Sequence, residues 1–165
     1  MQPKQLKKIR TLVVFFMVML ALSGITAFPV YTELHWLKQS GLMDGSGFAA
    51  TWLNSVYIAV AETQERFPFL FYGYDWLAFA HIVIAMLFIG VYQHPVRNRW
   101  IIQWAIITCI GVLPLAFIAG SIRGIPFFHI LIDCSFGIVG LIPLFIIQDR
   151  ISKLKKYRTK ERMNR

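Results

Sequence analysis

The chain has 165 residues, of which 57% are hydrophobic and 15% are charged. Soluble domains usually carry about a quarter charged residues, so much of this protein's surface must face something other than water. A net charge of +9 would suit nucleic-acid binding if the basic residues formed one patch on a soluble face. They stand instead at the ends of apolar runs, which favours a single membrane domain and gives no reason to expect a nucleic-acid partner.

Four apolar runs are long enough to cross a bilayer as helices, which takes about 20 residues each. A basic stretch precedes the first run, as it would in a signal peptide, but residues 28–30 (Phe-Pro-Val) form a poor cleavage site, so we expect a retained helix. Tyr31, Trp76, Tyr92 and Trp100 stand at the ends of runs, where their rings suit the headgroup level. The predicted spans are residues 12–31, 76–92, 100–119 and 126–148.

The distribution of Lys and Arg predicts the orientation of these spans. Of the 17 Lys and Arg residues, only Lys38, Arg66 and Arg123 belong to the segments on one side. The other 14 lie in the N-terminal stretch, the loop between spans two and three, and the tail 149–165. Because cytoplasmic loops carry an excess of Lys and Arg, the pattern predicts a multi-pass protein of a bacterial-type inner membrane with both termini cytoplasmic. The basic tail is expected to contact anionic lipid.

An outer segment, residues 32–75, separates the first two spans and is too long for a simple turn. Within it, apolar residues recur every four positions from Phe48 to Val60, which predicts a helix over about 47–61 with Ser46 as its N-cap. This helix is expected to lie on the outer leaflet, with a lid that closes a site as the alternative. The predicted fold is therefore all-α: an integral membrane four-helix bundle with an additional outer interfacial helix.

Ionisable residues at membrane depth are energetically costly and are usually paired or functional. Four such residues, Asp75, His81, His129 and Asp133, stand near the outer ends of spans two and four. At 1.5 Å per residue, both histidines lie within about 10 Å of those ends, so they are expected at similar heights. His129 and Asp133 are four residues apart and share one helix face. Arg123 lies in the short outer loop that precedes span four.

Spans two and four run in the same direction and would be diagonal neighbours in a square bundle, with axes about 11–14 Å apart. His81 and His129 could then sandwich a haem, each giving one axial nitrogen, with Arg123 near the propionates. In this respect the chain resembles small b-type membrane cytochromes, which are four-helix bundles with histidines on two helices. The resemblance is architectural and comes with no family motif. It implies a small haem-binding or redox membrane subunit with its site near the outer face.

Two other functions remain open from the sequence. His81, His129, Asp133 and Asp75 offer nitrogen and oxygen ligands for a divalent metal, or a relay for protons, in a membrane enzyme or carrier. Alternatively, the chain is a cofactor-free accessory or scaffold subunit of a membrane complex. In that case Asp75 caps the second span, and His129, Asp133 and Arg123 satisfy one another.

Motifs of soluble enzymes do not occur in the sequence, which contains no Walker A pattern, GxGxxG, HExxH or GxSxG. Catalysis by a soluble domain is therefore not expected. The two cysteines, Cys109 and Cys134, fall inside apolar runs without CxxC spacing, which indicates no disulfide framework.

Overall fold

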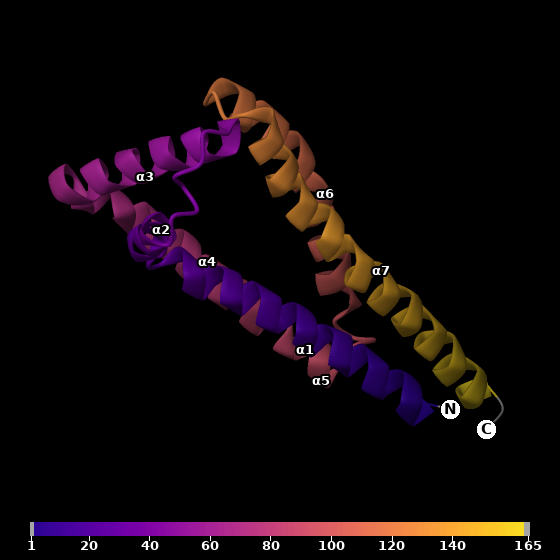
Figure 1. Ribbon diagram of the computed structural model, residues 1–165. Helices are drawn as coiled ribbons and strands as arrows, with labels where there is room; N and C mark the ends of the chain where they lie inside the picture. The colour runs from indigo at the N-terminus through magenta and orange to yellow at the C-terminus, as the bar shows by residue number, and fades with distance from the viewer. Residues whose placement is uncertain (1, 164–165) are drawn as a thin grey trace. The chain divides into compact units, whose positions relative to one another are not determined.

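The computed structural model is all-helical and describes residues 2–163, with the backbone alone for residues 2, 3, 158 and 160–162 (Figure 1). Arg165, the last residue of the predicted basic tail, lies outside the described residues. No strand occurs in the described part of the chain. The helices are α1 (Gln2–Ala27), α2 (Val30–Gln39), α3 (Phe48–Arg66), the short 3₁₀ helix η1 (Pro68–Phe71), α4 (Tyr72–Leu87), α5 (Ile89–Gln93), α6 (Arg99–Ile122) and α7 (Phe127–Met163).

Four helical stretches are long and apolar enough to cross a membrane, and they contain the four predicted spans almost entirely. Their bounds are Lys4–Ala27, Pro68–Gln93, Arg99–Ile122 and Phe127–Tyr157. Large apolar side chains cover their outsides: Phe15 is 55% exposed, Ile107 67% and Phe136 72%. A surface of this kind is the one that suits contact with lipid chains rather than water.

The chain divides into two compact units, which are described separately. Unit 1 consists of Met1–Met19 and Ala85–Arg165, and unit 2 is Leu20–Ile84. Unit 1 therefore holds the first part of α1, the end of α4, and α5, α6 and α7. Unit 2 holds the end of α1, most of α4, and the helices between them.

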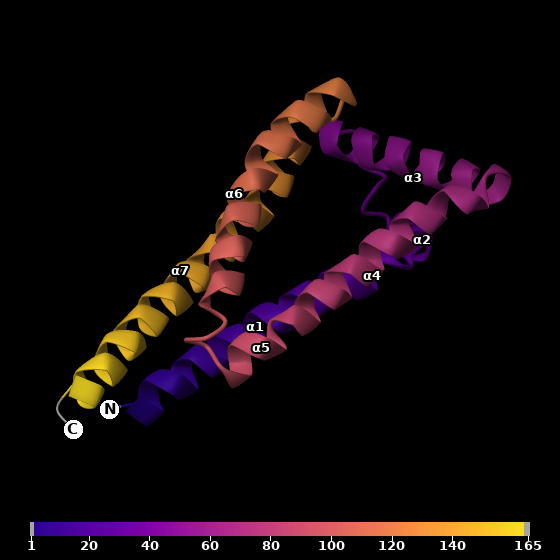
Figure 2. The same cartoon turned by 180° about the vertical axis from the view of Figure 1, so that it is seen from behind.

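In unit 1, α6 and α7 form an antiparallel hairpin and lie side by side in both views (Figures 1 and 2). The turn between them is a Schellman motif. Gly124 adopts a positive φ of 67°, its N–H donates to the Ser121 carbonyl, and the Ile125 N–H donates to the Gly120 carbonyl at 2.9 Å. Further along the hairpin, Gly137 brings the helices together: a Cβ on this residue would stand 2.8 Å from the Cys109 carbonyl oxygen. Cys109 and Cys134 are both free.

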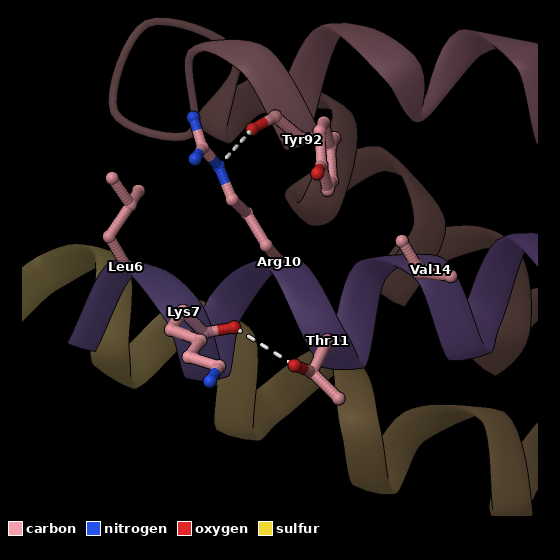
Figure 3. A pocket seen from close by; sticks show the side chains of 6 residues that line it. All are labelled: Leu6, Lys7, Arg10, Thr11, Val14 and Tyr92. Carbon is pink, nitrogen blue, oxygen red and sulfur yellow. Dashed lines mark hydrogen bonds between the residues drawn. The ribbon is translucent and has the colours of Figure 1, made fainter. Parts of the chain in front are cut away.

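The first part of α1 completes unit 1 by contacting both α5 and α7. The Arg10 side chain donates to the backbone carbonyl of Tyr92 on one side of α1 (Figure 3). Arg150 of α7 donates through Nη1 to Gln5 Oε1 at 2.8 Å. The core between these helices is aliphatic, with one phenylalanine pair whose ring centroids are 4.9 Å apart. Its fully buried large side chains are Ile9, Val13, Phe88, Val91, Ile102, Leu144, Ile147 and Ile151.

In unit 2, α1 ends at Ala27, earlier than the predicted span end at Tyr31. Pro29 explains the difference, because proline disfavours helical backbone at the residue before it and cannot donate to the preceding turn. Helix α2 then begins at Val30 and was not predicted. Helix α3 begins at Phe48 with Gly47 as its N-cap and no side-chain cap bond, so the prediction of Ser46 as the cap was wrong.

Candidate functional site

His81 lies on α4 in unit 2, and its ring is oriented by its own helix. Its Nδ1 lies 2.8 Å from the backbone carbonyl oxygen of Leu77, one turn earlier. A carbonyl oxygen can only accept, so Nδ1 must carry the proton and donate it. In the neutral ring the lone pair then resides on Nε2, which is the state in which histidine binds a metal ion.

The backbone around His81 is held by a close approach of α1. A Cβ on Gly24 would lie 2.7 Å from the Ala78 carbonyl oxygen and 3.0 Å from the His81 Cβ. Only glycine therefore permits this spacing between α1 and α4. The two helices are therefore in close contact beside His81, and this contact holds the part of the backbone that carries its imidazole.

Asp75 does not cap α4 as one hypothesis required, because the helix already begins at Tyr72 and Asp75 lies within its first turn. The carboxylate is exposed. His81 stands six positions further along α4, and at 3.6 residues per turn the two side chains leave the helix on different sides. Helix geometry therefore does not bring Asp75 and His81 onto one face.

His129 and Asp133 lie on the first two turns of α7, in unit 1. His129 Nε2 and Asp133 Oδ1 are 3.9 Å apart, and both side chains are partly exposed. This distance is too long for a hydrogen bond but places the carboxylate beside the imidazole. The predicted sharing of a face by these two residues is thus present in the structure.

Arg123 caps α6 directly before this pair. Its backbone N–H donates to the Ala119 carbonyl at 3.0 Å, and its side chain is exposed. The glycine turn described above presents this side chain at the end of the α6–α7 hairpin, the same end at which His129 begins α7. The cation is therefore available to an anionic group there.

The predicted site residues belong to different units, with Asp75 and His81 in unit 2 and Arg123, His129 and Asp133 in unit 1. Joint coordination of one group by His81 and His129 therefore stays a prediction. No group of three or more His, Cys, Asp and Glu side chains positioned to hold a metal ion occurs among residues 2–163 with described side chains.

A histidine network in unit 2 was not predicted from the sequence. The His35 ring stacks with the rings of Tyr31 and Tyr57, whose centroids lie 5.8 Å and 6.2 Å away. Gln39 Nε2 donates to His35 Nε2 at 3.0 Å, so Nδ1 carries the proton and donates to the Tyr57 hydroxyl, also at 3.0 Å. Both ring nitrogens are thus occupied, and the network joins α2 to α3. The spacing of His35 and Gln39 by one turn was visible in the sequence, but the contact with Tyr57 was not.

In comparisons with known proteins, no protein-family model, no curated protein and no solved structure matches the chain.

Proposed function

We propose that the chain is a multi-pass protein of a bacterial-type inner membrane, with four spanning helices and both termini in the cytoplasm. Four sufficiently long apolar helices support the membrane location. The concentration of 14 of the 17 Lys and Arg residues on one side supports the orientation. In this arrangement α3, with its aromatic and aliphatic positions, is the helix that lies along the outer leaflet.

Labelling of single cysteines in intact cells tests the orientation. In a background with Cys109→Ala and Cys134→Ala, a membrane-impermeant maleimide should label Ser46→Cys in intact cells. It should label Thr159→Cys only after the cells are broken. The reverse pattern would overturn the orientation, while labelling of both positions in intact cells would place the two segments on the same outer side.

We further propose that the protein is a small b-type haem-binding or redox membrane subunit, with the site on the outer side. The observation that carries the proposal is the His81 ring, whose Nδ1–H is held by the Leu77 carbonyl and whose Nε2 is left as a ligand. His129 is proposed as the second ligand, and Asp133 lies beside it. Arg123 is proposed to bind a propionate. A bound haem would supply one-electron redox chemistry, and the chain's part is to hold and orient it.

An absorbance spectrum tests this proposal directly. Protein purified after expression with haem supplied should show a Soret band, and His81→Ala and His129→Ala should each abolish or shift it. His35→Ala and His94→Ala are matched controls, because His35 is engaged between α2 and α3 and His94 lies in the loop before α6. Absence of the band from the unaltered protein, or its persistence in both site variants, would contradict haem binding.

The proximity of His129 and Asp133 favours a second candidate, a proton- or metal-dependent carrier or enzyme. Elemental analysis of colourless purified protein distinguishes the metal form, which predicts a stoichiometric divalent ion that Asp133→Asn removes. Protein without colour or metal that co-purifies with one stoichiometric partner would instead support an accessory subunit.

A further inference from the structure

A groove between α1 and α7 in unit 1 combines a basic end with an apolar end. Its volume is about 580 Å³, within the range of about 300–1,000 Å³ that ligand sites commonly have. No acidic residue occurs among the described side chains that line it. The lining residues are Lys4, Lys7, Lys8, Thr11, Leu12, Ile146 and Arg150.

The two ends of the groove follow from the opposite directions of its two helices. On α1, Lys4, Lys8 and Leu12 are spaced by four, so one face changes from basic to apolar as the helix proceeds. On α7, Ile146 precedes Arg150 by the same spacing, so that face changes from apolar to basic. The hydrogen bond from Arg150 to Gln5 places the basic end of the α7 face beside the basic end of the α1 face. Leu12 and Ile146 then lie together at the other end of the groove, which is apolar.

The charge in this groove is not neutralised within the part of the chain that the structure describes. The nearest carboxylate in sequence, that of Asp149, accepts from Lys153 Nζ at 2.6 Å. Arg150 uses Nη1 for Gln5, while its Nε is buried without a hydrogen-bond partner. A buried donor in that state is costly. The Nε of Arg99 is in the same state, so the groove is distinguished by the unneutralised charge of Lys4 and Lys8.

We propose that this groove binds an anionic phospholipid, with the headgroup phosphate among Lys4, Lys8 and Arg150 and the acyl chains along Leu12 and Ile146. A second basic cavity, formed by α6 and the C-terminal part of α7, is lined by Arg99, Lys155 and Lys156. Its other lining residues are Ser152, Thr159 and Met163, so its apolar part is one methionine and not aliphatic side chains from two helices. Because the groove between α1 and α7 has both a basic and an aliphatic end, the occupant that we assign to it is a lipid and not a free anion.

This inference rests on the membrane location proposed above but not on haem binding or on which side faces the cytoplasm. Native mass spectrometry in detergent micelles, with phosphatidylglycerol or phosphatidylcholine added, measures the apparent affinity for the first bound lipid irrespective of topology. The unaltered protein should prefer phosphatidylglycerol. An excess of inorganic phosphate should not displace that lipid, and full displacement by phosphate would overturn the assignment to a lipid.

The matched variants remove equal charge from the two cavities. The double variant Lys4→Gln/Lys8→Gln should weaken the first phosphatidylglycerol by about tenfold, whereas Lys155→Gln/Lys156→Gln should change it by less than about twofold. Both alter exposed lysines, so both should fold, which thermal unfolding checks. Equal loss of phosphatidylglycerol affinity in the two double variants would indicate diffuse attraction of the lipid to the basic end of the protein. Unchanged affinity in the first double variant would show that Lys4 and Lys8 do not bind the headgroup. Either result overturns the proposal.

Discussion

Arg10 donates its Nε–H to the backbone carbonyl oxygen of Tyr92 over 3.1 Å, and its guanidinium carbon lies 5.1 Å from the centroid of the Tyr92 ring (Figure 3). Tyr92 belongs to the last turn of α5, where carbonyl groups lack partners within the helix. One side chain thus satisfies a helix end and stacks on an aromatic ring. The contact joins α1 to α5 across 82 positions of sequence.

Arg10→Gln should lower the free energy of unfolding by about 1 kcal/mol, because it removes a charge-assisted hydrogen bond and a cation–π contact at a partly exposed site. Arg10→Lys should have a free energy of unfolding between those of the unaltered protein and Arg10→Gln, since it keeps the charge but loses the guanidinium geometry. Thermal unfolding in detergent measures the effect. Arg97→Gln removes the same charge from an exposed loop position and serves as the control. Equal shifts for Arg97→Gln and Arg10→Gln would show that only net charge matters.

Gly137→Ala should destabilise the α6–α7 hairpin by about 1–3 kcal/mol, because the added Cβ would stand 2.8 Å from the Cys109 carbonyl oxygen and push two backbones apart. Gly111→Ala is the matched control on α6, where a Cβ meets nothing within 4 Å. That control should leave stability unchanged or raise it slightly, since alanine favours helix over glycine. Thermal unfolding of the two variants side by side should separate them. A similar outcome for both would argue against close packing at Gly137.

Tyr57→Phe should weaken the attachment of α3 to α2, because it removes the hydroxyl that accepts from His35 Nδ1. The expected loss is about 1 kcal/mol, and it should appear as faster amide hydrogen exchange in α2. Tyr74→Phe is the control, since it removes a hydroxyl from an exposed tyrosine on α4. Unchanged exchange in the Tyr57 variant would mean that ring stacking, not the hydrogen bond, holds α2 to α3.

Gly124→Ala should cost about 1 kcal/mol, because the residue adopts a φ of 67° that a side chain disfavours. A Cβ there would meet nothing within 4 Å, so the cost is conformational and not steric crowding by neighbours. Gly73 also faces open space but has ordinary helical backbone, so Gly73→Ala should not lower the free energy of unfolding. Chemical denaturation compares the two variants. A neutral Gly124→Ala would indicate that the turn relaxes without loss of stability.

Much of the fold could be predicted because the relevant properties are local. Four apolar runs of sufficient length and the paired spacing of His129 and Asp133 are readable from consecutive residues, and the structure contains both. The helix break at Pro29 is equally local: the apolar character of residues 12–31 predicts one continuous span, but the backbone limits of proline end the helix at Ala27. The same proline also indicates where a new helix can begin, and α2 does begin directly after it at Val30.

The sequence by itself therefore determined the number of long apolar helices, the uneven distribution of basic residues and the positions of the unusual polar residues along each helix. Only the tertiary structure decided which faces meet: Arg10 with Tyr92, Gly137 with Cys109, His35 with Tyr57, and Lys4 and Lys8 with Arg150 across one groove. The physical reason is that these helices are apolar on most sides, so hydrophobic periodicity does not distinguish a face that packs against protein from one that meets lipid. The faces that pack together are instead determined by close contacts at small residues and by the few polar groups that can pair.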